Sequence, residues 1–234
     1  MFDLSLAREV GRALALLLVV ATPVRAIDIQ IDYSLDAGGF FNQAGAQEAM
    51  EAVAVFFEEK LTDSLLAIDQ NAFGGSVSWS AVTAHPATGG STSFPAFVVP
   101  ADTIIVFVGS RDLPAGNAGV ASSGGFSAGG SSLVFDDWLA LLNGRGHAGA
   151  AFTNAALRTD FSPWGGSIAF DSVPDRPWHF QLEGRPSGSN TGFVSTALHE
   201  MGHILGVGLS DSWKNQIVGG AFTGPLSREA FGNV

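Results

Sequence analysis

Alternation of apolar and polar residues predicts several β-strands along this chain. Residues Ile27–Asp32 alternate isoleucine with Asp or Gln, and Val77–Ala81 alternates apolar residues with serine, the pattern of half-buried strands. Thr103–Val108 is a continuous β-branched and aromatic run, which is typical of a strand covered on both faces. Gly165–Asp171 predicts a further strand, with Trp178–Phe180 as its hairpin partner. We therefore expect a sheet at the centre of the fold.

Helical periodicity separates these predicted strands. Apolar residues recur at steps of three and four between residues 44 and 68, which predicts a long amphipathic helix. The apolar stripe consists of Ala46, Met50, Val53, Phe57, Leu61, Leu65 and Ile68. A shorter helix is predicted over Ser132–Leu142, with Gly144 as its stop. The Gly-, Ser- and Ala-rich stretch from Gly109 to Gly130 lacks the ending of a phosphate-binding loop, and we interpret it as a long surface loop.

A third helix is predicted after the last strands. Asn190 or Thr191 can cap its start, and Gly206 ends it, because glycine adopts the left-handed cap conformation without strain. The alternation of strands and helices fits one α+β domain over residues 27–234, with this third helix packed against a mixed sheet. The sequence contains no internal repeat and no convincing second domain.

The first 26 residues have the features of a secretory signal peptide. Arg8 and Arg12 precede a short apolar run, Ala13–Ala21, and Val24–Ala26 offers a small-x-small cleavage site. The run is much shorter than the roughly 20 residues that span a bilayer, and no second run follows. We therefore expect a soluble, exported protein that is extracellular, periplasmic or displayed at the cell surface.

Charge and cysteine content narrow the partners and the chemistry. Removing residues 1–26 takes away three Arg and two acidic residues, which leaves 8 basic and 20 acidic residues and a net charge of −12. Such a surface repels phosphate, so nucleic acid and anionic membranes are poor partners. The chain has no cysteine, which excludes disulfides, thiol catalysis and cysteine-bound zinc.

The third predicted helix carries the motif H-E-x-x-H-x-x-G. His199 and His203 are four residues apart, so both imidazoles can reach one divalent cation, for which zinc is the expected choice. Glu200 then lies beside the metal, where its carboxylate can take a proton from the activated water. Histidine pairs at this spacing also arise by chance, but Glu200, Gly206 and the apolar setting all favour a metal site. The motif predicts metal-assisted hydrolysis, usually of peptide bonds.

The segment Ala197–Gly206 resembles the active-site helix of the metzincin metallopeptidases. Gly166–Asp171, together with Trp178, resembles the substrate-binding edge strand and following turn of matrixin-like members. Further motifs are similar to exported bacterial metallopeptidase-like proteins, many of which end in a Pro-Glu-Pro sorting signal; they are Phe107–Gly109, Phe161–Gly166, Ser210–Trp213 and Gly219–Gly224. The resemblance implies a zincin-like fold, in which a twisted mixed sheet packs against a long N-terminal helix and the active-site helix. It also implies a polypeptide substrate.

The chain departs from the metzincin pattern at the third metal ligand. Metzincins usually place a third histidine three residues after the glycine, and that position is Leu209 here. No histidine follows His203, and Met201 is the last methionine, although the family has a methionine turn downstream. We therefore expect the third ligand and the methionine turn beyond Val234. Asp211 and Glu229 are weaker candidates, since Asp211 is equally a turn or helix-cap residue and a solvated helix face explains Glu229 better.

Three functions remain in competition. The leading prediction is a secreted zinc endopeptidase that uses Zn²⁺ at His199 and His203, with Glu200 as general base. The alternative is a non-catalytic, zincin-like surface or matrix protein that binds metal or polypeptide. The third hypothesis, a carbohydrate-binding module, is supported only by scattered tryptophans, which core packing explains as well. Neither substrate specificity nor oligomeric state is encoded in a readable motif.

Overall fold

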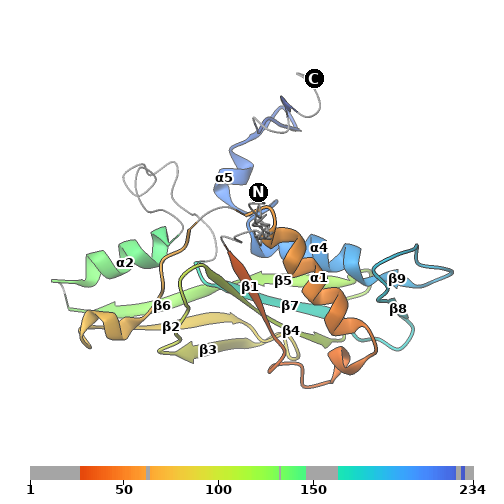
Figure 1. Cartoon of the computed structure of the whole chain (residues 1–234), viewed down its shortest axis with the longest axis horizontal. Coiled ribbons are helices and arrows are strands. Elements are labelled where there is room, and N and C mark those ends of the chain that lie inside the picture. Colours follow the sequence, from red (N-terminus) through yellow and green to blue (C-terminus); the bar gives the residue numbers. More distant parts are fainter. Residues whose placement is uncertain (1–26, 62–63, 132, 146–162, 225–227, 230–234) are drawn as a thin grey trace, which may run out of the picture.

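A computed structural model describes residues 27–61, 64–131, 133–145, 163–224 and 228–229 (Figure 1). The predicted signal peptide therefore lies outside the described residues. The main sheet contains four strands in the order β1-β4-β7-β5. These strands are β1 (Asp28–Asp32), β4 (Thr103–Arg111), β7 (Gly165–Asp171) and β5 (Gly119–Ser123). The first three are parallel and β5 is antiparallel to β7, so the sheet is mixed, as predicted, and the combination of sheets and helices agrees with the predicted α+β class.

Helices cover one face of this sheet. They are α1 (Ala46–Glu58) and α4 (Phe193–Ile204), which contact each other and lie over β1, β5 and β7 (Figure 1). Val106 and Val108 of β4 point into the core beneath these helices, together with Ile168 and Phe170 of β7. The predicted amphipathic first helix and the packing of the motif helix on the sheet are thereby confirmed.

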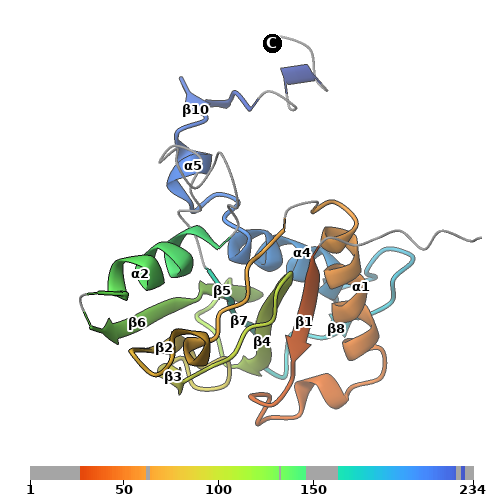
Figure 2. The same cartoon turned by 60° about the vertical axis from the view of Figure 1, so that its left-hand side comes forward.

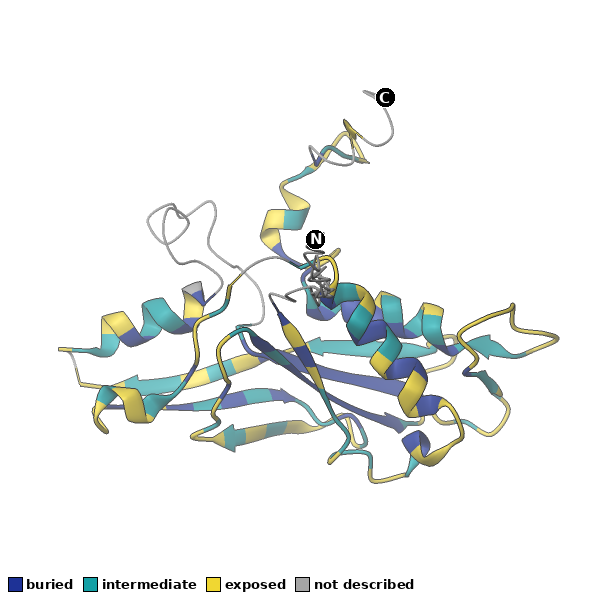
Figure 3. Ribbon diagram, viewed as in Figure 1, coloured by how far each residue is buried: buried dark blue, intermediate teal, exposed yellow. Residues whose placement is uncertain are grey.

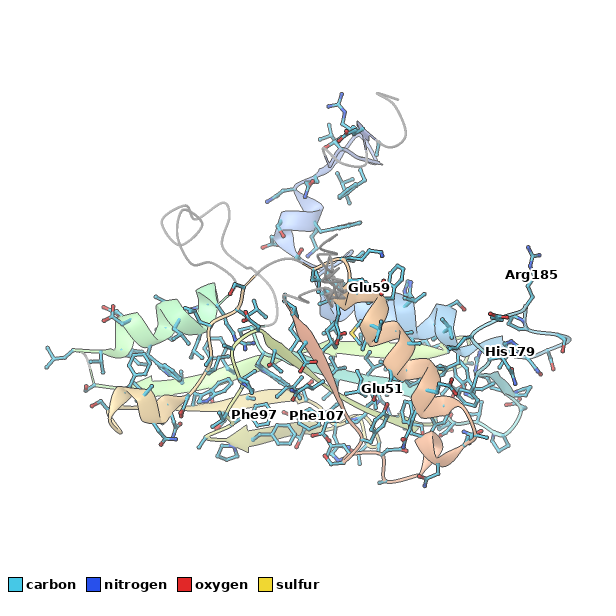
Figure 4. All side chains as sticks on the ribbon, viewed as in Figure 1. Glu51, Glu59, Phe97, Phe107, His179 and Arg185 are labelled. Atoms are coloured by element: carbon cyan, nitrogen blue, oxygen red, sulfur yellow. The ribbon has the colours of Figure 1, made fainter. Side chains whose placement is uncertain are left out.

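A second sheet covers the opposite face. It is antiparallel, in the order β3-β2-β6, and consists of β3 (Ser91–Pro95), β2 (Val77–Ala84) and β6 (Gly125–Gly130). Ile105 and Phe107 of β4 point into this second core, where Phe107 stacks on Phe94 with ring centroids 4.5 Å apart. Phe97 lies beside Phe107 in the same core (Figure 4). The apolar run of β4 is therefore buried on both faces, as predicted (Figure 3).

The remaining elements are short and lie at the margins. Helix α2 (Phe135–Gly144) packs Trp138 and Leu142 against the second core. The short elements are η1 (Phe40–Asn42), η2 (Gln70–Phe73), β8 (Trp178–His179), β9 (Thr191–Gly192), α5 (Asp211–Lys214), β10 (Ile217–Val218) and β11 (Ala221–Phe222). Figure 2 shows α5 and β10 standing away from the sheets and from α4. No helix among the described residues is long and apolar enough to cross a membrane.

The prediction of a long surface loop from Gly109 to Gly130 is wrong. This stretch holds the end of β4, all of β5 and all of β6, with Gly124 between the last two. Its strands escape recognition because, apart from Val120 and Phe126, they consist of Gly, Ser and Ala, which give no apolar alternation. Small side chains are needed here since neighbouring elements approach closely: a Cβ at Gly124 would lie 2.4 Å from the Trp164 ring.

Two helix boundaries also differ from prediction. The first helix ends at Glu58 rather than Ile68, so Leu65 and Ile68, which continue its apolar spacing, lie beyond the helix. Leu65 donates its N–H to Asp102 Oδ1, and Ile68 forms a β-bridge with Val99, so pairing with residues 99–102 replaces the helix. The shorter helix lies at Phe135–Gly144, displaced by a few residues toward the C-terminus.

Two predicted strand relationships are wrong as well. Residues 178–180 do not form a hairpin with β7, because β8 pairs in parallel with β9. Strand β7 is not an edge strand: it lies between β4 and β5, and all seven of its residues are buried. The edge of the main sheet on this side is β5.

Arg145 connects several segments of the chain near the start of β4. It is 1% exposed, and its guanidinium donates to the carbonyls of Leu66, Pro100, Thr103 and Pro163. Burial lowers the pKa of Arg145 to about 10, although the nearby Asp102 acts in the opposite direction. This one side chain therefore satisfies four backbone acceptors from separate parts of the chain.

Candidate metal and hydrolytic site

Helix α4 is held so that one face meets the core and another meets solvent. Phe193, Ala197, Met201 and Ile204 are buried in the core against α1 and the sheet. This packing leaves His199 exposed and His203 half-buried on the other side of the helix. The helix spacing thus places both histidines on one accessible face.

The start of α4 differs from prediction. Neither Asn190 nor Thr191 caps the helix; Gly192 occupies the cap position and provides no side chain. Ser195 and Thr196 donate their hydroxyls to the Gly192 carbonyl, at 3.0 and 2.9 Å. The cap prediction was wrong because the cap position falls one residue after Thr191, at a glycine; the two hydroxyls bond to its carbonyl and do not accept from the free N–H groups of the first turn.

The two histidines face each other through their Nε2 atoms, which are 3.0 Å apart. His203 Nδ1 lies 2.8 Å from the Val207 carbonyl, and a carbonyl can only accept, so Nδ1 carries the proton. In the neutral tautomer with the proton on Nδ1, Nε2 carries the lone pair, and this nitrogen faces His199. Two tetrahedral ligands about 2.0–2.1 Å from zinc lie about 3.3 Å apart, so this pair fits a zinc ion with a small adjustment.

Gly206 makes this orientation possible. Its N–H bonds to the His203 carbonyl at 3.0 Å, and the Val207 N–H bonds to the Gly202 carbonyl at 2.8 Å. These two bonds form a Schellman motif, which requires a left-handed residue after the helix, and Gly206 has φ +92°. The turn directs the Val207 carbonyl back onto His203. The prediction that Gly206 ends the helix is confirmed. The sequence did not indicate that Gly206 also orients His203.

Glu200 lies beneath strand β5. Its side chain is buried, at 7% exposure, and a Cβ at Gly119 would lie 2.7 Å from Glu200 Cγ and 3.0 Å from its Oε1. Any side chain larger than that of glycine at position 119 would collide with the Glu200 side chain in its present position. Gly119 was missed in the sequence because nothing in its local pattern marks it.

An open cleft brings these groups together. It has a volume of about 600 Å³ and lies between residues 116–121 on one side and α4 on the other. His199, Glu200 and His203 all line it, together with Ser195, Thr196 and Leu209. The three residues singled out by the motif therefore share one cavity.

Strand β5 presents free backbone groups beside this cleft. The Ala118 carbonyl accepts from Asp171 N–H, and Gly124 N–H donates to the Gly165 carbonyl, so even-numbered positions of β5 bond to β7. The alternation of an antiparallel ladder then directs the N–H and C=O groups of Gly119 and Ala121 away from β7. No other strand of the described chain pairs with this edge.

The candidate third ligands do not join the histidines. Asp211 is exposed in the first turn of α5 and lies 3.6 Å from Lys214 Nζ, while Ser210 caps that helix. Glu229 is also exposed. The described residues contain no group of three His, Cys, Asp or Glu side chains that could hold a metal ion. After His203, the next residue in the sequence that lines the cleft is Leu209, whose side chain is apolar and cannot bind a metal ion.

Comparisons with protein-family models, with curated proteins and with solved structures found no match to this chain.

Proposed function

We propose that this protein is a secreted zinc-dependent endopeptidase. The observation that carries the proposal is the facing pair of His199 and His203 Nε2 atoms, 3.0 Å apart, in the same cleft as the buried carboxylate of Glu200. This combination supplies metal ligands and a general base within one turn of one helix. A purely structural helix face would need neither the facing imidazoles nor the enclosed carboxylate.

His199 and His203 are the residues that would hold the zinc ion. When bound, zinc lowers the pKa of water toward neutrality and polarises a carbonyl group. The Val207 carbonyl holds His203 in the tautomer that leaves Nε2 free as a ligand. At least one of the two ligands, His203, is therefore already oriented for metal binding before a metal ion binds.

Glu200 acts as the general base. Its carboxylate is confined between α4 and β5, which restricts it to the cleft. It removes a proton from the attacking water and delivers that proton to the leaving amine as the peptide bond breaks. This role explains why an acidic side chain is kept in a position that is only 7% exposed.

The substrate is an extended polypeptide that binds along β5. The outward N–H and C=O groups of Gly119 and Ala121 can pair with a peptide strand, which is the ordinary way to extend a sheet edge. Gly119 lies over Glu200, so a peptide on this edge passes close to the base. The resemblance of α4 to the metzincin helix supports the same role, with β5 rather than β7 as the edge strand.

A second candidate is a zincin-like surface protein that binds metal or polypeptide without turnover. It is favoured by one observation: no third metal-binding side chain joins the two histidines among the described residues. Two histidines alone bind zinc more weakly than the three protein ligands of a catalytic site.

Zinc titration paired with cleavage of a casein-type substrate separates the two candidates. The wild-type protein should bind zinc and cleave, whereas Glu200→Gln should bind zinc equally and lose about 10²–10⁴-fold in rate. Glu48→Gln makes the same change at an exposed position of α1 and should alter neither property. Zinc binding without cleavage by wild type would establish the second candidate, and undiminished cleavage by Glu200→Gln would refute the base assignment.

A further inference from the structure

The carboxylate of Asp171 gathers three donors just outside the cleft. Asp171 ends β7, is 2% exposed, and does not line the cleft itself. Its Oδ2 accepts from Arg176 Nε at 2.6 Å, and its Oδ1 accepts from the N–H groups of Leu113 and Val173 at 3.1 and 3.4 Å. Burial raises the pKa of Asp171, but the bonds from Leu113 and Arg176 outweigh burial and leave it below its usual value. The carboxylate is therefore a charged junction.

One side of this junction fixes the wall that contains β5. Asp171 accepts from Leu113 N–H through its side chain and donates its own N–H to the Ala118 carbonyl at 3.0 Å. Both ends of the connection from β4 to β5 are thus attached to the same residue. Residues 116–121, which line the cleft, include one of these attached residues and lie a few positions after the other.

The other side of the junction reaches the start of α4. Arg176 Nη1 donates to Thr191 Oγ1 at 3.4 Å, and Thr191 precedes Gly192, the cap of the helix. Trp178 provides a second connection between Asp171 and α4. Its Nε1 donates to the Asp171 carbonyl at 2.9 Å, and its ring packs on Phe193. The helix that carries His199, Glu200 and His203 is therefore connected to Asp171 at its first residues.

We propose that Asp171 and Arg176 are positioning residues that set the separation of β5 and α4, and thereby the affinity for an extended peptide. The inference rests on the proposed endopeptidase function for its effect on substrate, but the mechanical link is independent of it. Neither residue touches the reacting groups. Loss of the pair lets the two walls of the cleft move separately, while the helix keeps His199, Glu200 and His203 in their mutual arrangement.

Hydrogen exchange of backbone amides tests the link directly. Arg176→Gln should speed exchange at least tenfold both in residues 113–121 and in residues 191–196. Arg111→Gln is the matched control, because Arg111 is also partly buried at a strand end but donates to the Pro86 carbonyl, away from the cleft. Faster exchange confined to residues 171–177, or equal changes in the control, would overturn the proposal.

Arg176→Lys gives a second, milder test in case the glutamine variant does not fold. Lysine keeps the charge opposite Asp171 but lacks the fork that also reaches Thr191. Exchange should therefore rise in residues 191–196 and stay unchanged in residues 113–118. A rise in both segments, or in neither, would contradict the assignment of the two sides of the junction.

Peptide cleavage provides the readout that a merely stabilising pair would not move. In Arg176→Gln, KM should rise about tenfold, with kcat within about twofold of wild type, and the further change Asp171→Asn should add little. A fall in kcat at constant KM would overturn the positioning role. If wild type shows no cleavage at all, the proposed function fails, while the exchange result still decides whether the two walls are linked.

Discussion

Gly119 of the edge strand lies directly over Glu200 of the motif helix. A methyl group at position 119 would come within 2.7 Å of Glu200 Cγ, so Gly119→Ala must displace the carboxylate. We expect zinc affinity to remain and cleavage to fall at least tenfold. Zinc titration and casein cleavage measure the two properties.

Gly125→Ala is the matched control for this substitution. A Cβ at position 125 would meet nothing closer than the Val82 carbonyl at 3.9 Å, in the continuation of the same stretch. The control should cleave as wild type does. Equal activity of the Gly119→Ala protein would mean that Glu200 is not confined by β5 in the way described.

Replacing Gly206 should weaken zinc binding without touching a ligand. At φ +92°, an alanine is strained by about 1–2 kcal/mol, and relief of that strain moves the Val207 carbonyl away from His203. Loss of such an orienting partner typically costs about 10–100-fold in metal affinity, and we expect a decrease of this size for Gly206→Ala. Gly74→Ala carries the same kind of strain, at φ +62°, with no neighbour within 4 Å, and should leave zinc affinity unchanged.

A histidine at position 209 should strengthen the metal site. Leu209 lines the cleft with both histidines, and a third imidazole there would raise the number of protein ligands toward that of catalytic zinc sites. We expect Leu209→His to raise zinc affinity at least tenfold by titration. Leu182→His adds a histidine at an exposed position outside the cleft, and the same gain in that variant would show that the effect is nonspecific.

Arg145 should be a determinant of stability rather than of metal binding. Arg145→Met leaves the carbonyls of Leu66, Pro100, Thr103 and Pro163 without this donor, and each unpaired buried acceptor costs about 1–3 kcal/mol. We expect the free energy of unfolding in urea to fall by at least about 3 kcal/mol. A loss below about 1 kcal/mol would indicate that water replaces the guanidinium at these carbonyls.

Sequence patterns predicted the elements whose burial is regular. Strand β4 was recognisable since both of its faces meet apolar cores, and α4 was recognisable since His199 and His203 follow helical spacing in an apolar setting. Strand β5 was not, because close packing against Glu200 demands Gly119, and the remaining residues are small. The surroundings of the motif depend on such contacts between distant segments, which leave no local periodicity.

The same limit applies to the orienting contacts of the site. Gly206 was identified as a helix end from its type alone, but the bond from His203 to the Val207 carbonyl depends on the exact path of the turn. The junction at Asp171 joins residues 113, 171, 176 and 191 from two loops and two strands, and no motif relates them. The charge of Asp171 is visible in the sequence, whereas its partners are a property of the fold.

Metal removal and re-addition test the proposed endopeptidase most directly. Casein cleavage should disappear after dialysis against a chelator and return on addition of one equivalent of zinc per chain. His199→Ala should show no zinc-restored cleavage, because it removes one of the two facing Nε2 ligands. Cleavage that persists in the chelated protein, or that zinc restores equally in His199→Ala, would contradict the assignment of the metal site and of the function built on it.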